Sequence, residues 1–124
     1  MSANARIPSE FTRVVATRAL TVLRPGRDAA CLQLEIGEPV RDVETVGGMD
    51  WRCPVRWREG GAVSVRNACG VDAMQALQLA MQRMADDLAA LADEPGVRLL
   101  FLGEPFDART GLPRMRRPGG PTSA

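Results

Sequence analysis

The sequence predicts an α+β fold, in which an antiparallel meander of four or five strands packs against one long amphipathic helix at about residues 72–93. Between residues 11 and 67, apolar and polar residues alternate with the period of two that is typical of half-buried strands. From residue 72 the period changes to 3.6, that of a helix with one apolar face. A chain of 124 residues can bury one ordinary core without disulfides or a metal.

The first hairpin is predicted between Phe11 and Ile36. Its first strand is rich in Val, Thr and Leu. A turn follows, because Pro25 presets its own φ and Gly26 accepts a positive φ. The second strand then has one apolar and one polar face, formed by Leu32, Gln33, Leu34, Glu35 and Ile36.

A second hairpin is predicted after residues 40–50, a stretch whose pattern is ambiguous. The strand from 51 to 58 alternates strictly, with Trp51, Cys53, Val55 and Trp57 on one face and Arg52, Pro54, Arg56 and Arg58 on the other. Because proline cannot donate to a ladder, this strand is expected to be an edge or to be bulged at Pro54. After Gly60-Gly61, the returning strand is expected to place Val63 and Val65 inward and Ser64 and Arg66 outward.

The helix is expected to begin at Asp72, whose carboxylate caps the first turn with Gln75 three residues on. Its buried stripe is predicted to be Met74, Leu77, Met81, Met84, Leu88 and Leu91. Pro95 and Gly96 end it. A partner-binding methionine groove is the alternative interpretation of Met74, Met81 and Met84.

The domain organisation follows from composition. Residues 1–10 are expected to form a flexible arm, 11–106 a single domain, and 107–124 a disordered tail rich in Pro, Gly and Arg. No apolar run is long enough for a membrane span or a signal-peptide core, so we expect a cytoplasmic protein that does not contact a membrane.

The composition excludes most catalytic classes. The chain has no His or Lys, which removes the commonest general base and metal ligand and also Schiff-base chemistry. Its three cysteines, expected to be buried free thiols, do not have disulfide or zinc spacing: Cys31, Cys53 and Cys69. The carboxylate pairs late on the helix are interpreted as a solvated face. We therefore expect no enzyme, catalytic residue, cofactor or metal.

The candidate partner-binding residues are four arginines of the second hairpin, namely Arg52, Arg56, Arg58 and Arg66. They are predicted to form a row on one face of the sheet. One interpretation is that Glu35 and Asp50 neutralise this row from neighbouring strands. The other is a surface that recognises an acidic protein or a phosphate backbone. Nucleic acid is the weaker form, since both tryptophans face the other way.

Three segments resemble a family of short bacterial proteins known only as a domain of unknown function. They are Gly37-Glu38-Pro39-Val40, the Trp-x-Cys-Pro strand at 51–54, and the helix start Gly70-Val71-Asp72-Ala73-Met74-Gln75-Ala76-Leu77-Gln78-Leu79-Ala80. The resemblance covers about residues 18–113, including Gly111-Leu112-Pro113, and implies no activity or site. By size and architecture alone, the chain also resembles the immunity proteins that neutralise bacterial toxins.

These observations favour a non-enzymatic protein-binding module, in the form of a toxin-neutralising immunity protein or an adaptor. The alternatives are binding of nucleic acid or another anionic partner through the arginine face, and a structural homodimer. The expected partner is another protein of unknown identity.

Overall fold

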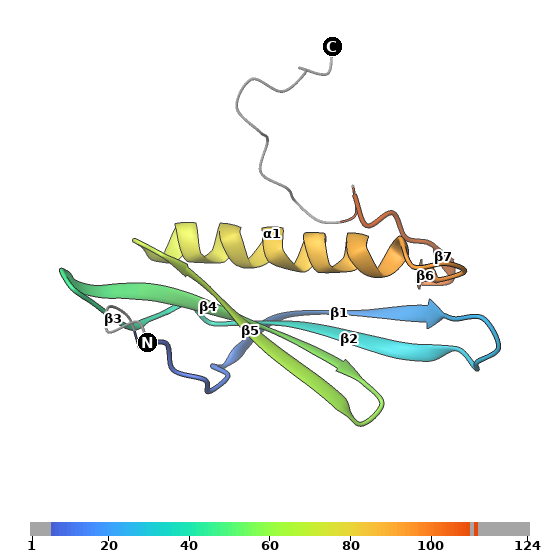
Figure 1. Cartoon of the computed structure of the whole chain (residues 1–124), viewed down its shortest axis with the longest axis horizontal. Coiled ribbons are helices and arrows are strands. Elements are labelled where there is room, and N and C mark those ends of the chain that lie inside the picture. Colours follow the sequence, from blue (N-terminus) through green and yellow to red (C-terminus); the bar gives the residue numbers. More distant parts are fainter. Residues whose placement is uncertain (1–5, 110, 112–124) are drawn as a thin grey trace, which may run out of the picture.

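The computed structural model describes residues 6–109 and 111, which form seven strands and one helix (Figure 1). The elements in chain order are β1 (Val14–Leu23), β2 (Ala30–Gly37), β3 (Val40–Thr45), β4 (Gly48–Glu59), β5 (Ala62–Gly70), α1 (Ala73–Ala92), β6 (Arg98–Phe101) and β7 (Glu104–Pro105). The α+β class is confirmed. The predicted strand number is too low, because the ambiguous stretch at 40–50 forms β3 and the start of β4, and two short strands follow the helix.

All the strands pair antiparallel in one sheet. Residues 55–59 of β4 pair with both β2 and β5, so these two strands lie on opposite sides of β4. β1 follows β2, and β6 pairs with β1 only at residues 21–23. Helix α1 carries the chain from β5, at one edge of the sheet, to β6 near the other.

The prediction that Pro54 marks an edge or a bulge in its strand is wrong, because β4 is central. β2 pairs with residues 55–59 of β4, and β3 pairs with residues 48–52. Pro54 falls between these two ladders, beside the chain that connects β2 to β3. Its missing N–H therefore interrupts neither ladder.

The predicted cap and ends of the helix are confirmed. Asp72 Oδ1 accepts a hydrogen bond from the backbone N–H of Gln75 at 2.7 Å, and Gln75 Oε1 accepts one from the N–H of Val71 at 2.8 Å. These bonds satisfy donors that the first turn leaves unpaired. Asp93 caps the other end.

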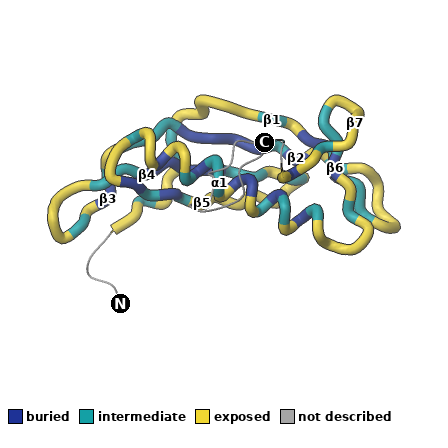
Figure 2. The backbone as a smooth tube through the Cα atoms, turned by 90° about the horizontal axis from the view of Figure 1, so that it is seen from above, coloured by how far each residue is buried: buried dark blue, intermediate teal, exposed yellow. Residues whose placement is uncertain are grey.

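The core lies between α1 and one face of the sheet, and the connecting turns are exposed (Figure 2). The helix contributes a stripe of buried residues to it: Ala76, Ala80, Met84, Ala85, Leu88 and Leu91. The predicted stripe is wrong at its N-terminal end, because Met74 is 73% and Leu77 38% exposed. The reason is a close approach. A Cβ on Gly70 would lie 2.7 Å from the backbone nitrogen of Ala76, so only small side chains fit between β5 and the start of α1.

Both ends of the described chain lie against the domain. Within the arm predicted at 1–10, the N–H of Arg6 donates to Glu44 and the carbonyl of Pro8 accepts from Asn67. Within the tail predicted at 107–124, Ala108 is buried in the core. Residues 1–5, 110 and 112–124 lie outside the described residues. In the described part of the chain, α1 is not apolar enough to cross a membrane.

Candidate functional site

The structure divides the predicted arginine row between the two faces of the sheet. Directly opposed residues of antiparallel strands point to the same face. β5 pairs Arg66 with Val55, a core residue, and Val65 with Arg56. Arg66 therefore lies on the helix side of the sheet, whereas Val63 and Val65 lie on the far face. The prediction that Val63 and Val65 point to the core and Arg66 points away from it is therefore wrong.

The physical reason is the turn between β4 and β5. Gly60-Gly61 is a two-residue turn that pairs Glu59 with Ala62, and this pairing fixes the register of every residue beyond it. Ser64 then lies opposite Trp57, and the apolar alternation of Val63 and Val65 does not change that register. The helix side of β5 consequently carries polar residues.

Arg52, the most buried member of the row, is a structural residue. It is 2% exposed, and its Nε and Nη2 donate to the two carboxylate oxygens of Asp42 at 2.8 and 3.1 Å. Its Nη1 donates to Asn67 Oδ1 at 3.0 Å and to the carbonyl of Glu10 at 2.8 Å. The partner is thus Asp42 and not the predicted Asp50. These bonds attach the N-terminal arm, β3 and β5 to β4.

Arg56 and Arg58 share one carboxylate, as predicted for Glu35. The Nε of Arg56 donates to Glu35 Oε1 at 2.6 Å, while the Nε of Arg58 lies 3.6 Å from the same oxygen. The guanidinium of Arg56 also stacks on the ring of Phe11, 4.0 Å from its centroid. Of the three arginines of the row that lie on this face, Arg58, 52% exposed, presents the most of its charge to solvent.

Glu35 gives the folded protein a pH dependence. The hydrogen bond from Arg56 holds the pKa of Glu35 below its ordinary value, against burial, which raises it. Because the pKa is lower in the folded than in the unfolded chain, the stabilisation is complete above the unfolded pKa of about 4.3. It is lost as the pH falls through the folded pKa.

We therefore expect the wild-type free energy of unfolding to fall more steeply below pH about 4.3 than that of Glu35→Gln. Urea denaturation of both proteins, repeated from neutral pH down into the acid range, measures the difference. Parallel profiles would contradict the role assigned to Glu35.

A groove lies between β5 and α1 on the helix side of the sheet. Two adjoining hollows of about 300 and 450 Å³ form it, and Asp87 lines both. The first is also lined by Trp57, Ser64, Arg66, Ala90, Leu91 and Glu94, and the second by Ala68, Cys69, Leu79, Gln82, Arg83 and Asp86. We call this feature the β5–α1 groove. It opens because β5 and α1 meet at Gly70 and then diverge (Figure 1).

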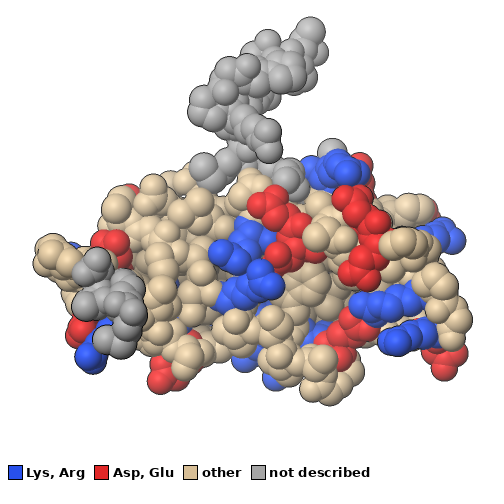
Figure 3. Space-filling model, in the orientation of Figure 1, with Lys and Arg blue, Asp and Glu red and all other residues tan. Residues whose placement is uncertain are grey.

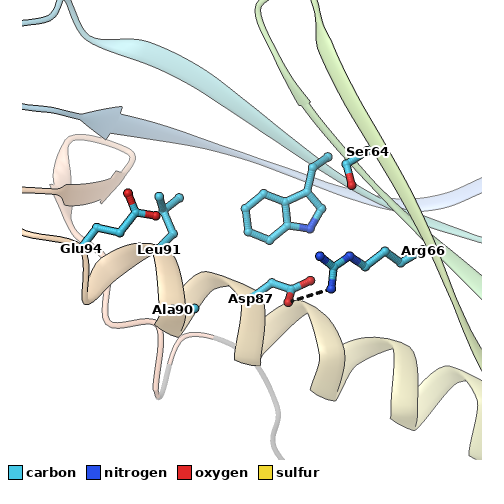
Figure 4. A pocket seen from close by; sticks show the side chains of 7 residues that line it. Ser64, Arg66, Asp87, Ala90, Leu91 and Glu94 are labelled. Atoms are coloured by element: carbon cyan, nitrogen blue, oxygen red, sulfur yellow. Dashed lines mark hydrogen bonds and ion pairs between the residues drawn. The ribbon is translucent and has the colours of Figure 1, made fainter.

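Arg66 of β5 and Asp87 of α1 point toward each other across the first hollow (Figure 4), which Trp57 also lines. The indole N–H of Trp57 is buried, and no acceptor among the described residues bonds to it. A buried donor without an acceptor costs about 1–3 kcal/mol. Because this N–H has almost no accessible surface, an acceptor reaches it only when the wall of the hollow moves, and the new bond then removes that cost.

The walls of the groove carry charges of both signs, and positive and negative side chains adjoin on this side of the molecule (Figure 3). Three carboxylates, of Asp86, Asp87 and Glu94, face two guanidinium groups, of Arg66 and Arg83. Arg66 Nη1 lies 3.5 Å from Asp87 Oδ1, and the Arg66 side chain is half exposed. An ion pair this long and exposed is weak, so it can rearrange around a ligand.

The outer edge of β5 runs beside this groove. Within the described residues β5 pairs only with β4, so its outward backbone N–H and C=O groups have no strand partner. An unpaired edge is a template for another extended chain. The strand edge and the groove together form a site that fits a peptide in extended conformation.

The three cysteines take different positions. Burial raises the pKa of Cys53 to about 11, and burial is also the main cause that raises the pKa of Cys69, beside the groove. Neither thiol is therefore an activated nucleophile. Cys31 is exposed, so the prediction of three buried thiols is wrong for this residue. It is the second residue of β2, where the alternation places it opposite Thr21, away from the core.

Sequence reasoning did not find the groove. From the sequence, Trp57 is expected to be a core residue, and Asp87 is expected to belong to a solvated face of the helix. The available signal was the two-residue turn at Gly60-Gly61, which places Arg66 and Ser64 on the helix side. The unsatisfied N–H of Trp57 depends on side-chain packing, which no sequence pattern shows.

The described residues define an α+β fold with one helix on an antiparallel sheet and a strand–helix groove. Residues 16–114 match the family described as Domain of unknown function (DUF6968), and the chain belongs to this family. No curated protein and no solved structure matches the chain.

Proposed function

We propose that the protein is a non-enzymatic binding module that takes an extended segment of a partner protein into the β5–α1 groove as an added strand on β5. The observation that carries the proposal is the position of the unpaired edge of β5 beside a groove that contains a buried, unbonded indole N–H. Strand addition supplies affinity through main-chain hydrogen bonds and specificity through pockets for alternate side chains.

The chemistry of the groove describes the segment it fits. An amide or carboxylate oxygen on one side chain accepts from the Nε1–H of Trp57. A basic side chain fits the opposite end of the first hollow, where Glu94 lies, since carboxylates outnumber guanidinium groups on the walls. The preferred partner segment is therefore extended, free of proline, and contains both a polar and a basic residue.

The other interpretations have less support. A nucleic-acid surface needs several unpaired arginines on one face, whereas Arg52 and Arg56 are bonded to carboxylates and Arg66 is on the other face. Catalysis is not proposed: the titratable side chains that line the groove are carboxylates, guanidinium groups and the Cys69 thiol, whose pKa burial raises. A toxin-neutralising immunity protein is one form of the proposal, with the segment supplied by the toxin.

The proposal predicts that peptides selected from a displayed library of random extended sequences lose binding when the groove is filled. Ala90 is an exposed helix residue that lines the first hollow, so Ala90→Trp fills the hollow without altering the core. We expect the dissociation constant to rise at least tenfold, measured by isothermal titration calorimetry.

The matched control is Gln78→Trp, which adds the same ring at an exposed position of α1 outside the groove. Binding to this variant should equal that of the wild type. Selected peptides that bind Ala90→Trp as tightly as Gln78→Trp would overturn the proposed site.

A further inference from the structure

The chain that follows β6 is attached to the domain by short ladders. β6 pairs with β1 only at residues 21–23, and β7 pairs with β6 at two positions. After β7 the structure describes residues 106–109 and 111. We call β7 together with these residues the C-terminal strap. The first five strands are joined to one another by longer ladders, so the strap is a part of the domain that can detach while they stay paired.

Arg18 of β1 holds the far end of the strap. Its Nη1 donates to the carbonyl of Gly111 at 2.9 Å, and its guanidinium lies 4.6 Å from the ring centroid of Phe101 and 5.9 Å from that of Phe106. Arg18 lies opposite Leu34, a core residue, so it points to the helix side of the sheet. An inward-pointing charge on an edge strand helps to keep that edge from pairing with another chain. The strap uses the same charge as its attachment.

Gly111 fits its position because it has no side chain. A Cβ on Gly111 would lie 2.4 Å from the ring of Phe106 and 2.7 Å from the carbonyl oxygen of Asp107. The two phenylalanine rings that meet the guanidinium pack edge to face, with centroids 6.3 Å apart. Ala108, between them and Gly111 in the sequence, is buried in the core. The closed strap therefore depends on a small number of contacts, each made by one named side chain or by its absence.

The turn that joins β6 to β7 favours the opposite state. Leu102 and Gly103 form this two-residue turn with φ of 53° and 82°. The left-handed region is unfavourable for a residue with a Cβ, and a turn of this type prefers Asn-Gly. Leu102 is also 86% exposed, so burial does not offset the strain. Opening of the β6–β7 ladder releases it.

We propose that the C-terminal strap opens as a unit, with the turn at Leu102 as its hinge and Arg18 as its attachment, while β1 to β5 and α1 stay folded. Closed, the strap lies on the outer side of β1. Open, it uncovers Phe101 and frees the guanidinium of Arg18, which also lines an apolar hollow beside Met81 and Met84. The outer side of β1 thus has a closed and an open state. β1 and β5 lie on different sides of β4 in the sheet, so the inference is independent of the proposed function.

Hydrogen exchange of the native full-length protein, followed residue by residue by NMR, tests the proposal. The N–H of Phe106 donates to the carbonyl of Leu99 at 2.9 Å, so its exchange reports opening of the strap. Amides in the centre of β4 report global unfolding. Arg18→Met should speed the exchange of Phe106 about tenfold and leave the β4 amides unchanged. Arg27→Met, at an exposed arginine of the first turn, is the matched control and should change neither.

Two further variants act in opposite directions. Gly111→Val should speed the exchange of Phe106 at least as much as Arg18→Met, whereas Gly47→Val, where a Cβ meets nothing within 4 Å, should not change it. Leu102→Asn should slow this exchange about fivefold by relieving the turn.

Exchange of Phe106 at the rate of the β4 amides in the wild type would overturn the proposal, because the strap would then open only by global unfolding. Equal acceleration of both sets of amides in Arg18→Met and Gly111→Val would overturn it for the same reason. Unchanged exchange of Phe106 in these two variants, or faster exchange in Leu102→Asn, would also contradict it.

Discussion

Replacing Arg52 with alanine is expected to lower the free energy of unfolding by about 2–4 kcal/mol. The substitution removes a buried guanidinium that donates to the carboxylate of Asp42, the side chain of Asn67 and the carbonyl of Glu10. Each of these acceptors then has to be resolvated or left unpaired. The estimate is below that for a fully buried pair because the Asp42 side chain is 37% exposed and regains water.

Arg58→Ala is the matched control for this experiment, since it removes the same side chain from the same face of β4. Its ion pair with Glu35 is long and its side chain half exposed, so the loss should stay below about 1 kcal/mol. Urea denaturation gives both values. Equal effects of the two substitutions would contradict a structural role for Arg52.

Leu88→Ala is expected to cost about 2–5 kcal/mol, the loss of transfer free energy plus a cavity. Leu88 is fully buried and belongs to the same core cluster as Val22, Leu32 and Leu34. Truncating it leaves a void that the rigid sheet fills only in part. Thermal unfolding followed by circular dichroism measures the effect.

Met74→Ala should change the stability of the monomer by less than about 0.5 kcal/mol, because Met74 is largely exposed. Comparing Leu88→Ala with Met74→Ala distinguishes the observed buried stripe of the helix, which includes only Leu88 of the two, from the predicted stripe, which includes both residues. A large loss for Met74→Ala at low protein concentration would show that the predicted stripe is correct.

Local chemistry is what could be predicted from the sequence. The Asp72 cap, the Pro–Gly end of the helix, and the facing of β2 and β4 each depend on a few neighbouring residues. The pairing of Glu35 with Arg56 could also be predicted from the sequence, since both residues lie on the polar faces of their strands and these strands are neighbours in the sheet.

The errors arise where a nonlocal constraint overrides a local pattern. Val63 and Val65 alternate as inward residues do, but the two-residue turn at Gly60-Gly61 fixes the opposite register. Met74 has the spacing of a core residue. However, β5 and the start of α1 approach closely at Gly70, and the buried residues of this part of the helix are Ala76 and Ala80. The first error concealed the site, because it placed Arg66 on the wrong face of the sheet.

The most direct test of strand addition on β5 is a two-dimensional ¹H–¹⁵N NMR titration with a selected peptide. The proposal predicts a downfield shift of the Trp57 indole N–H as it gains an acceptor, with shifts and slower exchange of outward-facing amides of β5. The indole signal of Trp51, outside the groove, serves as the internal reference. Peptide-induced shifts confined to the arginine face or to β1, with the Trp57 signal unmoved, would contradict it.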